Sequence, residues 1–298
     1  LPHSCRTCLS SRKHEIVITL NMVQPSNKKE ISIEEQKEIQ KGIFESVHNY
    51  CKKHGLRYFM TGGTLLGAVR HKGYIPWDDD IDIIMPRSDY QRFIELCEKE
   101  PISDNLSIAS VYNNKDCIYP FIKVYRNDTV VIEHMSKVFK TGVWLDIFPL
   151  DNMSNNYDDA VKLFNEIKRL RIIKEAELWG SNNIVSWWKR IILVSYGKVL
   201  RTFYPLRHLL MKMEKKARRY ESKNMSKYVC VVVMGIYGLS DIMVSSAYED
   251  EVLLEFEGKL RCAPKDWDYV LKQLFKDYMT LPPVEKRITH HNYICYWK

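Results

Sequence analysis

Residues 60–85, with the sequence MTGGTLLGAVRHKGYIPWDDDIDIIM, decide which fold and which chemistry this chain can support. Gly62-Gly63-Thr64 lies between two apolar runs, an order typical of a strand, a tight turn and the start of a helix. The backbone N–H groups and the Thr64 hydroxyl at such a helix start can bind an anion. We therefore expect a phosphate-binding turn here.

The second half of the stretch is rich in carboxylates. Asp80 and Asp82 alternate with Ile81 and Ile83, so on a strand both carboxylates face one side and both isoleucines the other. Two like charges at such positions repel unless a cation lies between them, and a divalent cation with oxygen ligands fits there. A solvated acidic loop is the alternative, but the isoleucines make the segment too apolar for it. A phosphate site beside a cation site indicates phosphoryl or nucleotidyl transfer.

Asp146 lies in the middle of another predicted strand, 143–148. An aspartate among apolar residues is costly to bury unless it is paired or bound to a metal ion. If a cation compensates its charge, removing Asp146 should cost the metal-free protein little stability. If it caps a helix or pairs with an arginine, the cost should be about 1 kcal/mol or more.

Lys123 projects from a predicted strand, 119–125, and the chain then turns at 126–128 and returns over 129–132, a pattern that predicts a hairpin. From the residues alone, Lys123 is either a surface lysine or a phosphate ligand.

Upstream of this stretch, Ser32 followed by Glu35 is a capping-box pattern that predicts the start of a helix. Apolar residues then recur on one helical face, at Ile39, Ile43, Val47 and Cys51. Gly55 is expected to end the helix.

The composition limits the class of protein. A chain of 298 residues with 45% hydrophobic and 28% charged residues is ordinary for a globular protein of one large or two small domains. Its net charge of +8 is concentrated between residues 168 and 219. Helical periodicity over 158–220 mixes basic residues with aromatic ones such as Trp187 and Trp188. Two interpretations stay open: a helical bundle with a solvated basic face, and docking on an anionic membrane surface.

Six of the eight cysteines are scattered singly, which indicates a reducing compartment rather than a disulfide framework. Cys5 and Cys8 have the spacing of half a zinc site, but no matching second ligand pair follows. We expect no signal peptide, and the apolar stretch 184–200 is too short and too charged to span a bilayer. The sequence begins at Leu1, and Met22 is an alternative start.

Residues 61–86, with the glycine turn and the run Ile-Pro-Trp-Asp-Asp-Asp-Ile-Asp-Ile, closely resemble the LicD family. Blocks at 143–151 and within 256–291 also match, although 155–238 matches only loosely and Phe275-Lys276 stands where the family usually has Tyr-Gly. LicD proteins are phosphocholine transferases, related to fukutin-type ribitol-phosphate transferases.

The resemblance implies an α/β (α+β) fold, with a nucleotidyltransferase-like mixed sheet core flanked by helices and a helical C-terminal half. We expect a poorly defined N-terminal extension at 1–31 and a catalytic core at 32–154. A mainly helical region at 155–298 would complete the site and contact membrane or acceptor.

By the same resemblance, Asp80, Asp82 and Asp146 are the catalytic carboxylates, and together with Asp78 they hold Mg²⁺ or Mn²⁺. The basic residues carried over would neutralise charge that develops on phosphate. The full set of implied substrate-binding residues is Gly62, Gly63, Thr64, Arg70, His71, Lys72, Trp77, Lys123, Glu257 and Arg287.

The implied activity is transfer of phosphocholine or a similar phospho-alcohol from a CDP-linked donor to a hydroxyl of a cell-surface glycan, with CMP leaving. Lipopolysaccharide, teichoic acid or capsule, free or lipid-linked, would be the acceptor. The expected location is the cytoplasm, or peripherally the inner face of the cell membrane.

Two other functions stay open. One is a nucleotidyltransferase that moves NMP from an NTP to a small molecule or RNA. The other is a non-catalytic basic module that binds membrane or nucleic acid. The carboxylates count against a nucleic-acid partner, because they repel phosphate unless a metal ion is present.

Overall fold

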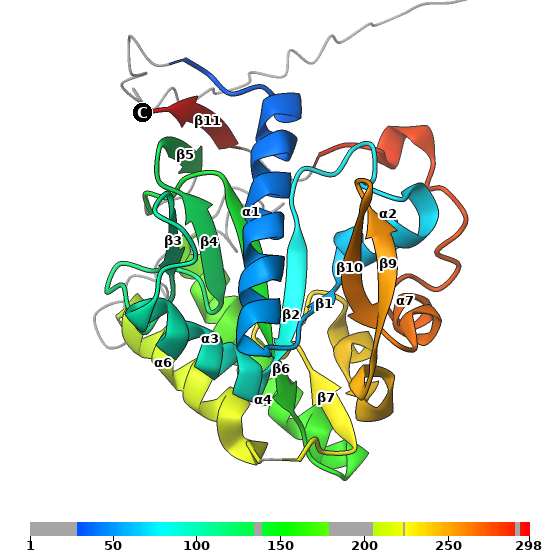
Figure 1. Cartoon of the computed structure of the whole chain (residues 1–298). Coiled ribbons are helices and arrows are strands. Elements are labelled where there is room, and N and C mark those ends of the chain that lie inside the picture. Colours follow the sequence, from blue (N-terminus) through cyan, green and yellow to red (C-terminus); the bar gives the residue numbers. More distant parts are fainter. Residues whose placement is uncertain (1–28, 134–138, 179–204, 223, 290–292) are drawn as a thin grey trace, which may run out of the picture.

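The computed structural model describes residues 29–133, 139–178, 205–222, 224–289 and 293–298 (Figure 1). The segment around Trp187 and Trp188 and the pair Cys5 and Cys8 lie outside these residues, so the predictions made for them stay predictions. Of the helices within these ranges, none is both long enough and apolar enough to cross a membrane.

A mixed sheet of seven strands forms the centre of the described structure. Its order is β1-β2-β6-β4-β3, and β7 and β8 extend it from β6. Strands β2 and β6 are parallel, and the other neighbours are antiparallel. The strands are β1 (Phe59–Met60), β2 (Asp82–Pro86), β3 (Leu106–Ala109), β4 (Ile122–Arg126), β6 (Trp144–Asn152), β7 (Tyr228–Cys230) and β8 (Met243–Val244).

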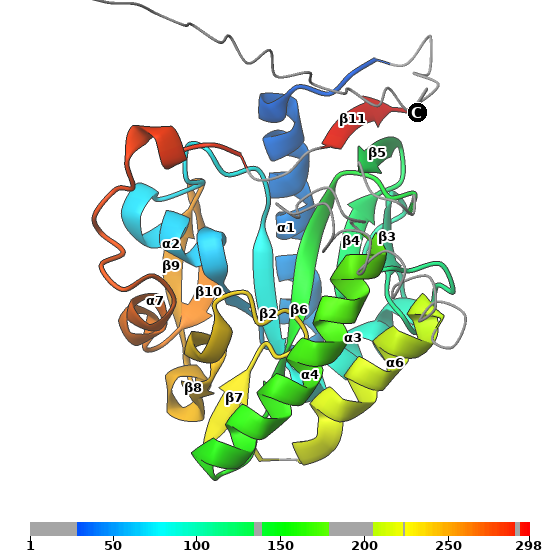
Figure 2. The ribbon, with the colours of Figure 1, turned by 180° about the vertical axis from the view of Figure 1, so that it is seen from behind.

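Helices flank this sheet, which confirms the predicted fold class. Helix α1 lies in front of the sheet in Figure 1, and α4 and α6 lie in front of it when the molecule is seen from behind in Figure 2. Helices α2 and α7 pack against each other beside β1 and β2. The helices are α1 (Ile33–His54), α2 (Gly62–His71), α3 (Arg87–Lys99), α4 (Tyr157–Leu178), α6 (Leu206–Ala217) and α7 (Trp267–Phe275).

Helix α1 begins and ends where the capping residues in its sequence predict. The Ser32 hydroxyl accepts a hydrogen bond from the Glu35 N–H at 3.2 Å, and Gly55 ends the helix in the left-handed conformation, at φ 61°. The predicted apolar stripe is buried and packs on the sheet. The helix is thereby held against the strands that carry the carboxylates.

The C-terminal half contributes strands as well as helices α4, α6 and α7. Strands β9 (Glu251–Phe256) and β10 (Lys259–Pro264) form a hairpin beside α2, and short 3-10 helices precede it. The last strand, β11 (Tyr293–Trp297), returns to pair with β5 (Thr129–Glu133).

This pairing corrects the hairpin predicted for 119–132. Strand β5 does not pair with β4, because β3 and β6 already occupy the two edges of β4. Instead β5 pairs with β11 from the end of the chain. The long-range pairing wins because a central strand has no free edge left to accept its neighbour in sequence.

Candidate active site

Asp82 and Asp146 are brought together by the two parallel strands. Asp82 opens β2, Asp146 lies within β6, and the two residues are register partners. The start of α2 is attached at the same place, because the Thr64 hydroxyl accepts from the Asp82 N–H at 2.8 Å. The Thr61 N–H in turn donates to the Asp82 carbonyl oxygen at 3.2 Å. Thr64 thus lies next to Asp82, and its hydroxyl oxygen already accepts one hydrogen bond from the protein itself.

The glycine turn fits closely around two carboxylates. Gly62 has φ +53°, and a Cβ there would lie 3.7 Å from Asp82 Oδ2. A Cβ at Gly63 would overlap Asp78 Oδ2. The carboxylate of Asp78 therefore lies directly against the first turn of α2, where the helix dipole favours negative charge. The predicted phosphate position next to Gly63 is taken by Asp78 in this structure.

Strand β2 begins only at Asp82, which corrects the prediction that Asp80 shares the strand. Asp78, Asp79 and Asp80, here called the acidic turn, directly follow a turn at Pro76 and Trp77. A hydrogen bond from the Asp78 N–H to the Ile75 carbonyl oxygen at 2.9 Å closes that turn. Each of the three offers a carboxylate oxygen within 4.8 Å of the other two. This group can hold a metal ion.

Asp79 is the acidic residue that the sequence analysis missed. Its carbonyl oxygen accepts from Gln36 Nε2 and Gln40 Nε2 of α1, both at 2.9 Å. Its Oδ2 accepts from the Tyr293 hydroxyl, also at 2.9 Å. Asp79 therefore anchors the acidic turn to α1 and to β11. No local signal distinguishes it from its two neighbours, since its partners lie far away in the sequence.

Burial and like charge act together on Asp82. Burial raises the pKa of the Asp82 carboxyl well above its usual range, and the charges of Asp80, Asp146 and Asp78 raise it further, while Lys123 opposes the rise. Asp82 Oδ1 is buried and has no hydrogen-bond partner among the described residues. A buried carboxylate oxygen without a partner, surrounded by other carboxylates, fits a divalent cation with oxygen ligands.

Lys123 lies opposite Asp146, where β4 pairs with β6. Its Nζ is 3.0 Å from Asp146 Oδ1, and Trp144 Nε1 donates to Asp146 Oδ2 at 3.2 Å. Nζ also lies over the rings of Trp144 and Tyr119, at 4.0 and 4.5 Å from their centroids. The surface interpretation of Lys123 is wrong, since the residue is buried. In this structure Lys123 is the partner of Asp146.

Four of the predicted substrate-binding residues gather beside the acidic turn. Arg70 Nε donates to His71 Nε2 at 2.9 Å, and Arg287 lies over the Trp77 ring at 5.5 Å. The rings of His71 and Trp77 meet edge to face. Burial lowers the pKa of Arg70, and the positive charge of Arg287 lowers it further. Two like charges this close together, without a described carboxylate in ion-pair contact with either, suit an anionic ligand.

Lys72 and Glu257 lie further out and support the loop before the acidic turn. The Glu257 N–H donates to the Lys72 carbonyl oxygen at 2.8 Å, and Glu257 Oε1 accepts from the Tyr74 N–H at 3.1 Å. Glu257 also forms an ion pair with Lys41 of α1, at 3.5 Å. In this structure the contacts described for Lys72 and Glu257 are with other parts of the protein, and they hold the loop in place.

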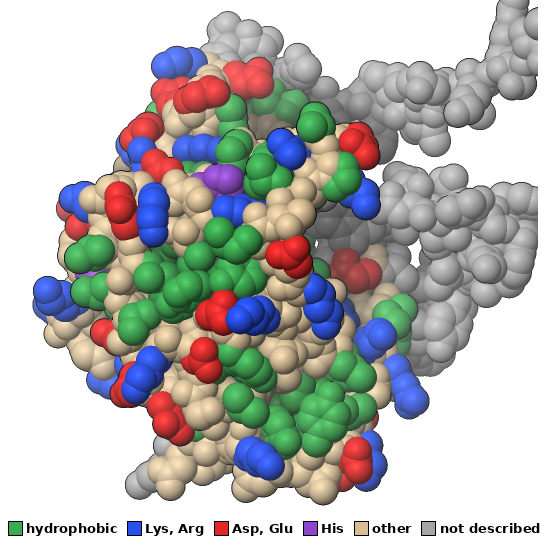
Figure 3. Space-filling model, turned by 90° about the vertical axis from the view of Figure 1, so that its right-hand side faces the viewer, with side chains coloured by type: hydrophobic (Ala, Val, Ile, Leu, Met, Phe, Trp, Pro, Cys, Tyr) green, Lys and Arg blue, Asp and Glu red, His purple; other side chains and the backbone are tan. Residues whose placement is uncertain are grey.

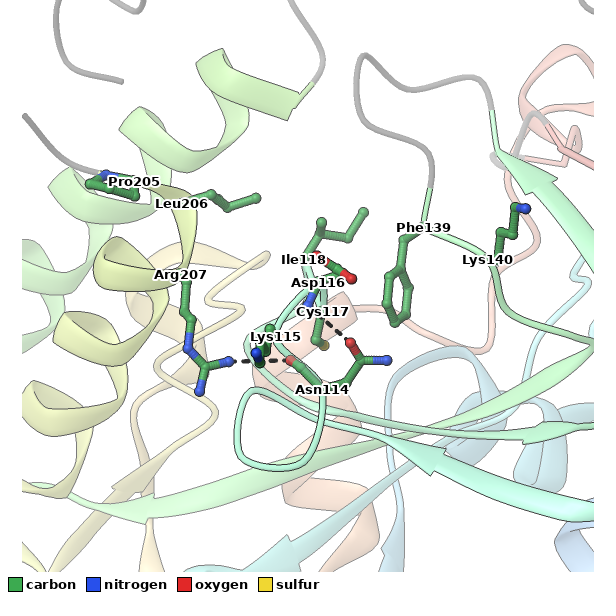
Figure 4. Close-up of a pocket in the computed structure, with 10 residues that line it drawn as sticks. All are labelled: Asn114, Lys115, Asp116, Cys117, Ile118, Phe139, Lys140, Pro205, Leu206 and Arg207. Atoms are coloured by element: carbon green, nitrogen blue, oxygen red, sulfur yellow. Dashed lines mark hydrogen bonds between the residues drawn. The ribbon is translucent and has the colours of Figure 1, made fainter. Parts of the chain in front are cut away.

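The described residues enclose several cavities, and one of about 270 Å³ is lined by Glu257 and Lys41. Another of about 70 Å³ adjoins Asp82 and Gly62. A larger one of about 510 Å³, shown in Figure 4, lies between the start of α6 and the loop at 114–118. Its basic side chains are Lys115, Lys140 and Arg207, and it contains none of the predicted site residues. We call Asp78, Asp80, Asp82 and Asp146 the acidic cluster. Of these four, Asp82 lines the cavity of about 70 Å³, and none lines the larger ones.

Comparison with known proteins shows which proteins this chain is similar to. Residues 55–174 match the family model described as the LicD/FKTN/FKRP nucleotidyltransferase domain. The chain is 28% identical over 274 residues to the lipopolysaccharide cholinephosphotransferase LicD of Haemophilus influenzae, which covers 88% of this chain and 97% of that protein.

A second likeness is short. Over 29 residues the chain is 59% identical to human ribitol 5-phosphate transferase FKRP, a match that covers 10% of this chain and 6% of FKRP. The matched family domain includes the glycine turn, the acidic turn, Lys123 and Asp146. Residues 55–174 therefore match the LicD family domain, and the likeness to LicD of Haemophilus influenzae extends over most of the chain.

Proposed function

We propose that this protein is a metal-dependent transferase that moves a phospho-alcohol group from a CDP-linked donor to a hydroxyl of a glycan. The observation that carries the proposal is the convergence of Asp78, Asp80, Asp82 and Asp146 at the first turn of α2, with Asp82 Oδ1 buried and unpartnered among the described residues. The LicD relative is a lipopolysaccharide cholinephosphotransferase, and FKRP is a ribitol 5-phosphate transferase. Both names describe transfer of a phosphate that carries a small alcohol.

Asp78, Asp80, Asp82 and Asp146 would hold the cation, and their hard oxygen ligands suit Mg²⁺ or Mn²⁺. A cation bound there would offset the negative charge of the donor diphosphate. Lys123 stays against Asp146 and limits the charge of the cluster when the cation is absent.

The basic and aromatic group beside the acidic turn would position the donor. Arg70 and Arg287 present guanidinium groups to phosphate oxygens, and Trp77 and His71 offer ring surface to the cytosine base. The acceptor hydroxyl oxygen attacks the phosphorus atom that carries the alcohol. A new P–O bond forms while the bond to the CMP oxygen breaks, and the hydroxyl proton passes to a carboxylate of the acidic cluster.

The acceptor is a glycan or a lipid-linked glycan, which would bring the protein to a membrane surface. The segment after α7 exposes large apolar side chains beside the basic Lys286. These are Met279, Leu281, Val284 and Ile288. Figure 3 shows the side of the molecule that carries α2, α7 and the β9–β10 hairpin, where hydrophobic side chains gather between charged ones. Liposome co-sedimentation that weakens as salt rises tests this peripheral contact.

The decisive experiment offers the purified protein CDP-choline or CDP-ribitol with Mg²⁺, with and without extracted glycan, and measures CMP. Glycan-dependent CMP release that disappears with EDTA is the expected result. Release of pyrophosphate from an NTP, without CMP release from either donor, would instead identify a nucleotidyltransferase. If neither CMP nor pyrophosphate is released with any donor or acceptor, the transferase proposal is wrong.

A further inference from the structure

The C-terminal strand β11 reaches the acidic turn from the far end of the chain. One of its edges pairs with β5, and on the other edge the Ile31 N–H donates to the Cys295 carbonyl oxygen at 2.9 Å. The Trp297 N–H donates to the Lys29 carbonyl oxygen at the same distance. Figure 1 shows β11 beside the start of α1, with β5 next to it. The strand is held on both edges, which fixes the place of its first residue, Tyr293.

The Tyr293 hydroxyl links this strand to the acidic turn. It donates to Asp79 Oδ2 at 2.9 Å and accepts from Gln36 Nε2. Gln36 Nε2 also donates to the Asp79 carbonyl oxygen at 2.9 Å. Gln36 and Asp79 are both buried, so the loss of one partner is costly to the other. One hydroxyl thus joins β11, α1 and the residue that stands between Asp78 and Asp80.

The Tyr293 ring reaches the other part of the acidic cluster. It packs edge to face on the Trp144 ring, with centroids 4.9 Å apart. Trp144 Nε1 in turn donates to Asp146 Oδ2 at 3.2 Å, and Lys123 Nζ lies over the same ring. Trp144 is buried, and a ring enclosed on all sides has little freedom to move. Tyr293 therefore contacts the acidic turn through its hydroxyl and the support of Asp146 through its ring.

A cation site at the acidic cluster depends on such a link, because its carboxylates come from separate parts of the chain. Asp78 and Asp80 lie in the acidic turn between α2 and β2, whereas Asp146 lies within β6. The carboxylates repel one another, so other contacts must hold the turn near Asp146 before the cation binds. Ligands held in place in advance need less ordering on binding.

We propose that Tyr293 is a positioning residue for the cation site. Its hydroxyl fixes Asp79, and through Asp79 it keeps the acidic turn where Asp78 and Asp80 can share a cation with Asp146. The inference rests on the proposed function, which assigns a cation to these carboxylates. A purely structural role would instead lower the stability of the protein and leave its affinity for the cation unchanged.

The test measures Mn²⁺ binding directly, by the EPR signal of free Mn²⁺, with the full chain and no donor. Tyr293→Phe keeps the ring on Trp144 and removes the hydroxyl alone. Its Kd for Mn²⁺ should rise about tenfold, an effect typical of losing a group that orients metal ligands. Tyr296→Phe is the matched control and should bind Mn²⁺ like the wild type. Tyr296 lies three residues further along β11 and hence on its opposite face.

A second comparison tests whether Tyr293 acts through Asp79. Asp79→Ala removes the carboxylate that the hydroxyl holds, but it keeps the carbonyl oxygen to which Gln36 and Gln40 donate. In this background Tyr293→Phe should cause no further loss of Mn²⁺ affinity, because its partner is already absent. Losses that add in the double variant would overturn the inference. Circular dichroism in EDTA checks that each variant is folded.

Turnover separates this inference from the proposed function. Tyr293→Phe should need about tenfold more Mg²⁺ for half-maximal CMP release, and kcat at saturating Mg²⁺ should stay within about twofold of the wild type. An unchanged Kd for Mn²⁺ in Tyr293→Phe would overturn the inference and leave the transferase intact. If Mn²⁺ binding depends on Tyr293 but no donor gives CMP, the inference stands and the proposed function fails. A wild type that binds no Mn²⁺ would overturn both.

Discussion

Asp82 and Asp146 are register partners on the parallel strands β2 and β6, and Lys123 lies opposite Asp146 on β4. One carboxylate of the pair thus has a buried lysine partner, whereas Asp82 Oδ1 is buried without a described hydrogen-bond partner. The negative charge of Asp146 is thus balanced by a lysine within the protein, whereas that of Asp82 is not balanced in the same way. We therefore make separate predictions for the two residues.

For Asp82, we expect the charge to be needed for activity and not for folding. Asp82→Asn should lower CMP release by about 10² to 10³-fold, the cost typical of losing one electrostatic contact in an active site. It should not lower the melting temperature without metal, because it relieves repulsion in the cluster. Asp104→Asn, at an exposed position of the loop before β3, serves as the control. Wild-type turnover in Asp82→Asn would argue against the acidic cluster as the active site.

For Asp146, the structure changes the expectation drawn from the sequence. Removing Asp146 leaves the Lys123 ammonium buried without its carboxylate, so Asp146→Ala should destabilise the protein by about 3 kcal/mol rather than leave it unaffected. Urea unfolding in EDTA measures this cost. The double variant Lys123→Met/Asp146→Asn should recover much of the loss, because no buried charge is then unpaired. Additive losses in the double variant would contradict the pairing.

Gly63 should be needed for the position of Asp78. In Gly63→Ala, the new Cβ would overlap Asp78 Oδ2 and push that carboxylate away from the first turn of α2. We expect at least a tenfold drop in CMP release with little loss of stability, since the displaced atom ends a movable side chain. Gly42→Ala is the control: it lies in α1 with open space around it, and should be neutral or stabilise by about 0.5 to 1 kcal/mol. Full activity of Gly63→Ala would show that Asp78 is dispensable.

Glu166 of α4 should make the contact with α6 sensitive to acid. Hydrogen bonds from Arg219 and Lys216 lower the pKa of Glu166 to about 2. A lowered folded-state pKa stabilises the protein above the unfolded-state value, and this contribution is lost as pH falls from about 4.5 towards 2. The group is about one-third exposed, so the contribution at pH 7 should stay below about 1 kcal/mol.

Thermal melts of the wild type and Glu166→Gln, taken at pH 7 and near pH 3, measure this effect. The two proteins should differ at pH 7 and converge as the pH falls. Glu98→Gln, at an exposed position of α3, should match the wild type throughout. A constant difference between wild type and Glu166→Gln at all pH values would show that the ionised carboxylate is not the cause.

Much of the candidate site follows from the sequence because its parts are local. The glycine turn, the start of α2 and the acidic run all lie within residues 60–85, where glycines and apolar runs mark the turn and the helix. The alternation from Asp80 to Ile83 placed the strand two residues too early, since β2 begins at Asp82. Helix α1 follows in the same way from its cap and its apolar stripe. The resemblance to LicD proteins added the role of Asp146, which its single position in a predicted strand left open.

Tertiary structure decided what pairs with these parts. The sequence could not show that β5 joins β11, that Lys123 lies against Asp146, or that Asp79 is tied to α1 and Tyr293. Nor could it show that Asp241 lines a cavity beside Asp82. Periodicity reports which face of an element is buried, but it carries no record of which distant element covers that face. The partners of these charges depend on long-range strand pairing, and only the folded chain brings them together.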